Sequence, residues 1–512
     1  MYGQPSLRQR HGGFQRADKD TMSNHNAASL SISLEPDSGV PAHRQIHEQI
    51  RLLIESRRLP IGARLSSSRR LAAELGVSRM TTQTALDSLL AEGYLVSAPR
   101  RGLFVAEHLP LSAAPDAASL PTHISARDSG RDIIRFESGA AVADFPNQAW
   151  RRCLRQSWLS PSLELMEGTL PGGYPPLRSA VADMLYSLRG LRCAPEHILI
   201  TAGNRDALTL VLNTLRRLHP ERSSVWLETP CYPPVLNGLR GLGLTPKPLN
   251  VDSEGAQIPN APEDPSQSTA SLAALVTPAR QYPLGHMMSA RRRQQWLDHL
   301  AARSRNGDSL WLIEDDYDSE FIYEGRPQAP LSAADETGHS ILLGSFSKSL
   351  FRSLRLGYIV APPALIEPLR ATQKTLGQAA ALPLQPALHH FIDSGEFASH
   401  LRRMRRLYLD RRDQSLEMLH RAGLPLTPWP CRSGMHLIAE LDHDCPLDDV
   451  QWAQRAETYH LQLDTLARHY WAEGQARHRG FLLGFSARDI DYQQRAMELL
   501  QQSLNAQARN PA

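Results

Sequence analysis

The sequence predicts an α/β protein in which a small helical module precedes a large, mostly parallel sheet covered by helices. Two observations lead to this fold class. From about residue 131 onward, continuous apolar runs alternate with stretches of helical periodicity, as buried strands of a parallel sheet do. Before residue 109, three helical stretches are followed by two short β-prone runs. The 512-residue chain is too long for one compact core, and we expect a smaller α+β part after about residue 400.

Composition excludes several classes of protein. The apolar fraction of 41%, the charged fraction of 21% and the mean hydropathy of −0.36 are typical of a soluble globular protein. No apolar run approaches the roughly 20 residues that cross a bilayer, and the polar N-terminus lacks the apolar core of a signal peptide. Five scattered cysteines without a C-x-x-C pair indicate neither a disulfide framework nor a zinc site. We therefore expect a cytoplasmic protein with no membrane partner and no metal site.

Two stretches of biased composition divide the chain into four segments. Residues 1–36 are rich in Ser, Gly, Asn, Arg and His without apolar periodicity, which predicts a disordered leader. Residues 109–130 are rich in Ala, Ser and Pro and are also aperiodic, which predicts a flexible linker. The helical module then occupies residues 37–108, and the large domain occupies residues 131–505.

The helical module has the pattern of a winged helix-turn-helix. A first helix is predicted over residues 41–60, where apolar residues recur at helical spacing between two prolines. Gly76 separates two further helices, and Ser78 is well placed to cap the second of them. Residues 94–107 form two β-prone runs around a Pro-Arg-Arg-Gly turn, which predicts a hairpin.

The charge of this module indicates a nucleic-acid partner. Residues 41–108 hold ten Arg and no Lys against six acidic residues, an excess of four positive charges. In a winged helix, the helix after the turn enters the major groove by its N-terminal end, while nearby arginines neutralise phosphates. The alternative is a small helical cap whose arginines only face solvent. The side chains predicted to contact double-stranded DNA are Arg64, Ser68, Arg69, Ser78, Arg79, Met80, Thr81, Thr82, Gln83, Arg100 and Arg101.

Polar residues at the ends of predicted strands give the large domain its chemistry. Lys348 follows the apolar run Ile-Leu-Leu, and Asp315 and Tyr317 end another apolar run about 30 residues earlier. Residues 201–208 lead a strand through Gly203 into the start of a helix, whose free N–H groups form an anion site. Because ligands bind at the carboxyl ends of strands in such sheets, we expect these groups to share one site.

This set of side chains suits pyridoxal 5′-phosphate. The aldehyde of that cofactor needs an amine nucleophile, which Lys348 could supply as a Schiff base. Asp315 could hold the proton on the pyridine nitrogen, and Tyr317 could hydrogen-bond the phenolic oxygen of the ring. Each residue alone has a simpler interpretation, because a lysine after a strand is usually exposed and an Asp-rich loop could be merely acidic or bind a metal. The phosphate and the face of the ring are assigned to Arg355, Ser345, the backbone N–H groups of Gly203 and Asn204, and Tyr232.

Long motifs in both parts carry a resemblance to known families. The run LPIGARLSSSRRLAAELGVSRMTTQTALDSLLAEGYL (59–95) is similar to the GntR-type winged helix. The motifs IEDDYDSEFIYEGRPQAPL (313–331) and GSFSKSLFRSLRLGY (344–358) resemble fold-type I aminotransferases. The pairing of the two parts in one chain resembles the MocR/GabR regulators. This resemblance implies an aminotransferase fold for the large domain and a head-to-tail homodimer.

The resemblance implies roles for single residues, and departures from it leave others open. Lys348 would be the lysine that binds the cofactor, Asp315 the partner of the pyridine nitrogen and Arg355 a phosphate ligand. These regulators commonly carry a Tyr and an Asp where this chain has Gly168 and Leu170. Either cofactor affinity or ligand preference has shifted, or another positive charge compensates. The candidates for that charge are Arg205 and Arg280.

The leading functional hypothesis is a DNA-binding transcriptional regulator whose aminotransferase-like domain binds pyridoxal 5′-phosphate and senses the cofactor itself or an amino compound. An effector carboxylate would need a bidentate guanidinium, for which Arg468 is the first candidate and Arg479 the second. Either of them could instead be an ordinary surface arginine. The alternative function is a working aminotransferase with an accessory DNA-binding module, and residual transamination fits both functions. A third hypothesis is a DNA-binding protein whose large domain has lost the cofactor.

Overall fold

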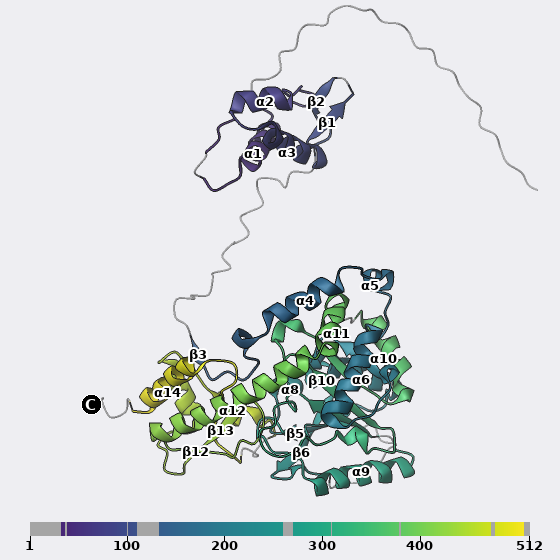
Figure 1. Cartoon of the computed structure of the whole chain (residues 1–512), viewed down its shortest axis with the longest axis vertical. Coiled ribbons are helices and arrows are strands. Elements are labelled where there is room, and N and C mark those ends of the chain that lie inside the picture. Colours follow the sequence, from purple (N-terminus) through teal and green to yellow (C-terminus); the bar gives the residue numbers. More distant parts are fainter. Residues whose placement is uncertain are drawn as a thin grey trace, which may run out of the picture. The chain divides into compact units, whose positions relative to one another are not determined.

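The computed structural model describes residues 32–35, 38–99, 101–109, 133–259, 270–308, 310–377, 380–472 and 477–505. The chain forms two compact units, which divide between Asp128 and Ser129 (Figure 1). Nearly all of the predicted leader and of the predicted linker lies outside the described residues. Within the described residues, no helix is long and apolar enough to cross a membrane.

The first unit is a winged helix, as the sequence predicts. Three helices pack around a small core in which Ile46, Ile50, Leu86 and Leu89 are fully buried. A two-stranded antiparallel hairpin follows the third helix and forms the wing. The elements are α1 (Ala42–Glu55), α2 (Ser68–Leu75), α3 (Arg79–Ala91), β1 (Leu95–Ala98) and β2 (Gly102–Val105).

Two serine caps and a glycine shape the turn between α2 and α3. The hydroxyl of Ser67 accepts a hydrogen bond from the backbone N–H of Arg70 at 3.3 Å and begins α2. Gly76 ends that helix at φ 68°, a left-handed conformation that glycine adopts without strain. Ser78 then accepts a hydrogen bond from the N–H of Thr81 at 3.1 Å and begins α3. Local residue chemistry therefore sets where α3 starts.

An eight-stranded sheet forms the centre of the second unit. Its strand order is β4-β11-β10-β9-β8-β5-β6-β7. The strands from β10 across to β6 pair in parallel, whereas β11 is antiparallel to both of its neighbours and β7 is antiparallel to β6. This mostly parallel sheet confirms the predicted fold class. The strands are β4 (Ile198–Thr201), β5 (Ser224–Thr229), β6 (Thr245–Asp252), β7 (Gly255–Ala256), β8 (Ser271–Val276), β9 (Trp311–Asp316), β10 (Ser340–Ser345) and β11 (Gly357–Val360).

Helices cover both faces of this sheet, and alternate side chains of β10 show the two layers. Ile341 and Leu343 belong to the buried cluster that contains residues of α7, α8 and α10. Leu342 belongs to the cluster on the other face, which contains residues of α4, α6, α11 and α12. The helices are α4 (Asn147–Ser157), α5 (Leu163–Glu167), α6 (Pro175–Arg189), α7 (Asn204–Leu218), α8 (Pro233–Gly241), α9 (Ala290–Arg305), α10 (Pro363–Leu376), α11 (Gln385–Asp393) and α12 (Glu396–Ala422).

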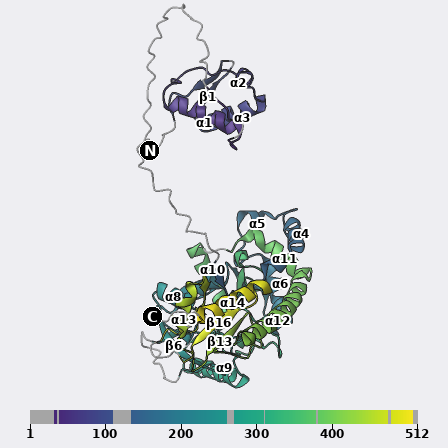
Figure 2. The same cartoon turned by 90° about the vertical axis from the view of Figure 1, so that its left-hand side faces the viewer.

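A smaller α+β part follows α12, as predicted. It contains a four-stranded antiparallel sheet in the order β12-β13-β16-β15, on which α13 and α14 lie (Figure 2). The short strand β14 pairs in parallel with β3, so the first described strand of the unit lies beside its C-terminal part. The elements are β3 (Ile134–Arg135), β12 (Leu426–Pro428), β13 (His436–Leu441), α13 (Asp449–Glu457), β14 (Leu461–Gln462), β15 (Asp464–Thr465), β16 (Gly480–Gly484) and α14 (Ile490–Asn505).

Candidate functional site

Three strand ends meet at one edge of the large sheet. Gly357 of β11 lies opposite both Thr201, the last residue of β4, and Ser345, the last residue of β10. The next strand, β9, is parallel to β10 and ends at Asp316. The segments that follow these strands therefore start close together, where ligands of such sheets bind. These segments carry Asn204, Tyr317 and Lys348.

Asp315, near the end of β9, lies against the start of α7. The side-chain N–H of Asn204 donates a hydrogen bond to a carboxylate oxygen of Asp315. Burial raises the pKa of Asp315 to about 7, the hydrogen bond from Asn204 opposes the rise, and the carboxylate of Asp316 adds to it. A cationic N–H placed against Asp315 would reverse this shift, because an opposite charge favours the ionised form.

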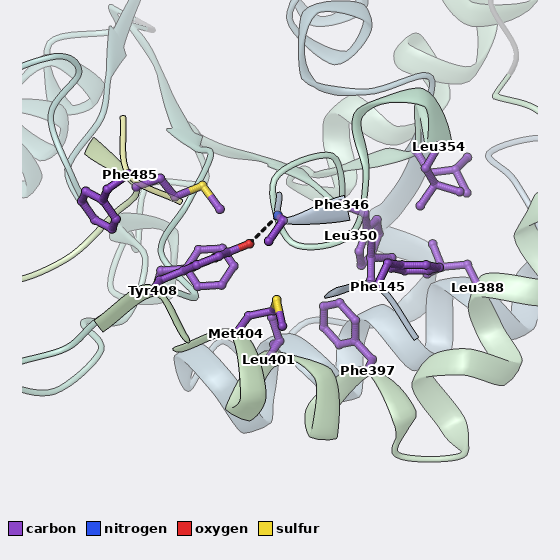
Figure 3. Close-up of a cluster of buried hydrophobic side chains, with 14 of the residues drawn as sticks. Phe145, Phe346, Leu350, Leu354, Leu388, Phe397, Leu401, Met404, Tyr408 and Phe485 are labelled. Carbon is purple, nitrogen blue, oxygen red and sulfur yellow. Dashed lines mark hydrogen bonds between the residues drawn. The ribbon is translucent and has the colours of Figure 1, made fainter. Parts of the chain in front are cut away.

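The residues before and after Lys348 in the sequence are packed into the apolar core. The side chains of Phe346 and Leu350 are each only 1% exposed. Both belong to the cluster shown in Figure 3, which also contains Phe145 and Phe397. Since close-packed side chains of this kind move little, the position of the Lys348 backbone is well defined.

The amine of Lys348 lies in a mixed electrostatic environment. It donates a hydrogen bond to the backbone carbonyl of Ser138 at 3.3 Å. Burial lowers its pKa to about 8, the carboxylate of Asp318 opposes this, and the guanidinium groups of Arg352 and Arg280 lower the pKa further. A pKa this low leaves a useful fraction of neutral, nucleophilic amine near neutral pH.

The segment that carries Ser138 is anchored to both the long helix α12 and the small C-terminal part. The N–H of Ala141 donates to the hydroxyl of Tyr408 at 2.9 Å, the bond drawn as a dashed line in Figure 3. The N–H of Gly139 donates to the hydroxyl of Ser486, just after β16, at 3.0 Å. The hydrogen bond from Lys348 therefore links the large sheet with the small part of the same unit.

Arg280, from the segment after β8, connects Tyr317 with Asp318. Its Nη1 donates to the hydroxyl oxygen of Tyr317 at 3.2 Å and lies 3.3 Å from a carboxylate oxygen of Asp318. Its Nη2 donates to the backbone carbonyl of His436 in β13 at 3.2 Å. Burial and the charge of Asp318 raise the pKa of Tyr317, whereas the charge of Arg280 opposes the rise. The phenol of Tyr317 is thus neutral and held in place.

The other predicted cofactor residues differ in how closely the structure links them to Asp315, Tyr317 and Lys348. Ser345 ends β10, directly before the Lys348 segment. Gly203 begins α7 at φ 95° with no side-chain cap, so the first turn of that helix presents backbone N–H groups at this edge. Arg355 is exposed and has a left-handed backbone with φ 46°. Tyr232 is 46% exposed, and its ring meets the ring of Tyr282 edge-on at 5.3 Å.

The two arginines predicted for an effector carboxylate differ in position. Arg468 is 56% exposed on its side chain and pairs with Asp464 at 3.2 Å. Its charge lowers the pKa of Tyr282 against the rise caused by burial, so it lies near that ring. Arg479 is exposed and directly precedes β16. The other end of that strand, at Gly484, lies beside His436. The structure therefore brings Arg468 toward the site and leaves Arg479 farther away.

Three contributors to the site were not predicted from the sequence. Asp318 directly follows Tyr317 in the same acidic stretch, and this adjacency is a signal that could have identified it from the sequence. Ser138 is 210 residues from Lys348, and His436 is 156 residues from Arg280. Only the tertiary fold brings these pairs together, and no local signal marks them.

Most residues predicted to contact DNA are exposed on the first unit. Met80, in the first turn of α3, is 77% exposed. The guanidinium of Arg101 lies 5.7 Å from the centre of the Phe104 ring in the wing. Arg100 lies outside the described residues. The exposed candidates are Arg64, Arg69, Ser78, Arg79, Met80 and Arg101, and the half-buried ones are Ser68, Thr81 and Gln83.

Thr82 corrects the prediction for this surface. Its side chain is fully buried, and its hydroxyl donates to the backbone carbonyls of Ser68 and Arg79, both at 3.0 Å. Thr82 therefore joins α3 to α2 and cannot reach a base edge. Thr82 lies four residues before Leu86 and seven before Leu89, so helical spacing places it on the buried face of α3. The prediction was wrong because it took every side chain at the N-terminal end of this helix as able to reach a base edge.

Comparisons of the whole chain with known proteins agree with this arrangement. Residues 42–105 match the model of the bacterial regulatory proteins of the gntR family, and residues 148–463 match that of aminotransferase class I and II. The probable rhizopine catabolism regulatory protein MocR of Rhizobium meliloti is 34% identical over 476 residues, which cover 90% of this chain and 92% of the relative. The HTH-type pyridoxine biosynthesis transcriptional regulator PdxR of Corynebacterium glutamicum is 34% identical over 471 residues, which cover 91% and 96%.

Solved aminotransferases share the fold of the large domain. The kynurenine aminotransferase of Pyrococcus horikoshii superposes with a TM-score of 0.63 at 22% identity, over 74% of this chain and 92% of its own. LysN, an α-aminoadipate aminotransferase of Thermus thermophilus, superposes with a TM-score of 0.61 at 25% identity, over 73% and 93%. These likenesses establish the predicted fold of the second unit.

Proposed function

The chain belongs to the MocR/GabR-type transcriptional regulators, and from this membership we propose that its Lys348 site senses an amino compound through pyridoxal 5′-phosphate. In such a chain a GntR-type winged helix binds DNA, and a domain of aminotransferase class I and II has pyridoxal 5′-phosphate as its cofactor. One observation carries the proposal. A half-buried amine, a half-buried carboxylate and a neutral phenol share one sheet edge, in the same chain as a basic winged helix.

The residues at this edge fit the cofactor. Among the described residues, the carboxylate of Asp315 has no cationic partner, and the pyridine nitrogen of the cofactor would supply one. The side-chain carbonyl oxygen of Asn204 is likewise buried without a hydrogen-bond partner in the described part of the chain. The start of α7, Ser345 and Arg355 offer donors for a phosphate. When bound, pyridoxal 5′-phosphate supplies an aldehyde that the amine of Lys348 can hold and for which a second amine competes.

Contacts around the site connect it with the small C-terminal part of the unit. Lys348 bonds to Ser138, whose segment bonds onward to Ser486 after β16. Arg280 bonds to His436 of β13. A ligand that disturbs these contacts would therefore change how the small part packs against the large sheet. Movement of the small part between an open and a closed position would supply the two conformations that sensing needs. For an effector carboxylate, Arg468 remains the first candidate and Arg479 the second.

We further propose that the protein acts in the cytoplasm as a head-to-tail homodimer, so that a change in closure alters the spacing of two DNA-binding units. Large apolar side chains that are exposed around α5 support association, because isolated soluble domains seldom expose such a group. Leu159 is 76% exposed, Leu163 is 68% exposed and Met166 is 64% exposed. Sedimentation of the full chain, with and without pyridoxal 5′-phosphate, measures the oligomeric state.

A lysine substitution tests the sensing role. Lys348→Ala in the full chain is expected to abolish the visible absorbance that stays with the protein after unbound pyridoxal 5′-phosphate is removed, and to abolish any effect of amines on DNA binding. Lys374→Ala is the matched control, because Lys374 is exposed on α10, and it should behave as the unchanged protein does. If Lys348→Ala keeps both the absorbance and the amine response, the proposal is wrong.

A second candidate function is transamination, and the lowered pKa of Lys348 favours it. A lysine with a pKa of about 8 is partly neutral near pH 7, so it can accept and donate protons as well as hold a cofactor. The purified full chain should be tested with several amino donors and keto-acid acceptors. Turnover on the order of 1 per second or more would favour an enzyme, whereas turnover far below that rate favours a sensor.

A further inference from the structure

Arg280 is a buried guanidinium inside the candidate cofactor site. Its side chain is 4% exposed, and it forms an ion pair with Asp318, which is 2% exposed on its side chain. The same Nη1 atom reaches both that carboxylate and the hydroxyl of Tyr317. Removing a charge from water costs free energy, and pairing offsets only part of that cost. An apolar contact of similar size would avoid the cost altogether. This cost points to a role in the chemistry of the site.

The backbone around Arg280 leaves room for its planar group. Gly434 has φ +84°, and a Cβ atom at that position would lie 2.2 Å from Cζ of Arg280. Gly285 has φ +75°, and a Cβ atom there would lie 3.5 Å from Nη2. At Gly434 both the conformation and the space favour glycine, whereas at Gly285 only the positive φ does. The loop after β8 and the loop before β13 together form a slot for the guanidinium.

We propose that Arg280 is a positioning residue of the cofactor site, which holds the hydroxyl of Tyr317 and the carboxylate of Asp318 and thereby sets the pH at which the cofactor-loaded site changes its protonation state. The inference rests on the proposed binding of pyridoxal 5′-phosphate at Lys348. In this role Arg280 influences the protonation of the cofactor ring and of the Lys348 amine. The sequence had instead suggested that Arg280 contacts the phosphate. Among the described residues, Arg280 forms no hydrogen bond or ion pair with the start of α7 or with Ser345.

The sign of the effect follows from the charges that face the site. Lys348 faces Asp318, which favours its protonated form, and Arg352 and Arg280, which disfavour it. Tyr317 faces Asp318 and Tyr282, which raise its pKa, and Arg280, which lowers it. Removing the charge of Arg280 also leaves the negative charge of Asp318 unpaired. The imidazole of His436 lies against the guanidinium, and burial, the larger cause of its lowered pKa, keeps it neutral when that charge is removed. Both consequences favour protonated groups, so the titration midpoint of the loaded site should move upward.

The test is a pH titration of the visible absorbance of the full chain loaded with pyridoxal 5′-phosphate. Arg280→Gln is expected to raise the midpoint by about one pH unit or more. Arg280→Lys keeps the charge, and its midpoint should lie within about half a unit of that of the unchanged protein. Arg305→Gln is the control, because Arg305 is exposed in the last turn of α9. Its midpoint should not move.

A double substitution keeps the test valid if Arg280→Gln does not fold. Arg280→Gln combined with Asp318→Asn removes both charges of the pair, so it leaves no unpaired buried charge. Its midpoint should return toward that of the unchanged protein, whereas Asp318→Asn alone should lower the midpoint. Arg280 is merely structural if Arg280→Gln titrates within about 0.2 unit of the unchanged protein or, where that variant does not fold, if the double variant titrates within about 0.2 unit of Asp318→Asn alone. If the unchanged protein shows no visible band with pyridoxal 5′-phosphate, the proposed function itself fails, which is a different outcome.

Discussion

Raising the pH should speed the uptake of pyridoxal 5′-phosphate by the cofactor-free protein up to about pH 8 and have little effect above it. Only the neutral amine of a lysine is a nucleophile. Burial lowers the pKa of Lys348 from its ordinary value of 10.5 to about 8. At pH 7, about one amine in ten is then neutral, compared with about one in 3,000 for an ordinary lysine, so uptake should be about 300-fold faster than at an exposed lysine.

The assay mixes cofactor-free full-length protein with pyridoxal 5′-phosphate and follows the visible absorbance over time. The rate should rise about tenfold for each pH unit below the midpoint and then level off. Asp318→Asn removes the carboxylate that favours the charged amine, so the midpoint should move to lower pH. Lys374→Ala should leave the whole profile unchanged. A rate that keeps rising tenfold per unit to about pH 10 would show that Lys348 behaves as an exposed lysine, and the reasoning would be refuted.

Three further changes test other contacts. Ser78→Ala removes the cap of α3 and should destabilise the winged helix by about 1 kcal/mol, seen as a lower urea midpoint for its unfolding transition; an unchanged midpoint would show that the cap contributes nothing. Arg69→Ala should weaken binding to any DNA and reduce the slope of log affinity against log salt by about 1, and an unaltered slope would place Arg69 away from the phosphates. Asp315→Asn should weaken cofactor binding about tenfold or more in equilibrium dialysis, because a neutral amide cannot stabilise a pyridine N–H cation, and equal affinity would contradict the role given to Asp315.

Elements with a strong local signal could be predicted from the sequence. Ser78 and Gly76 act on the backbone next to them, so the turn of the winged helix follows from residue chemistry alone. The parallel strands could be predicted because strands buried on both faces form continuous apolar runs, such as the one that ends before Asp315. The grouping of Asp315, Tyr317 and Lys348 followed from the rule that parallel strands end at a common edge.

Contacts made over long sequence distances could not be predicted. The bond from Lys348 to Ser138 and the bond from Arg280 to His436 depend on how the small part packs against the large sheet. The error at Thr82 is of a different kind, because its spacing of four residues from Leu86 and seven from Leu89 already places it on the buried face of α3.

The central claim is that occupancy of the Lys348 site changes DNA binding by the winged helix. DNA that binds the full chain can be selected from a random-sequence pool, and its affinity can then be measured by fluorescence anisotropy. The measurement compares the unchanged protein and Lys348→Ala, each without ligand, with pyridoxal 5′-phosphate, and with the cofactor plus a panel of primary amines. At least one ligand condition should change the affinity of the unchanged protein by about fivefold or more, whereas Lys348→Ala should show no change. An affinity that stays constant in the unchanged protein, while visible absorbance shows the cofactor to be bound and displaced, would contradict the central claim.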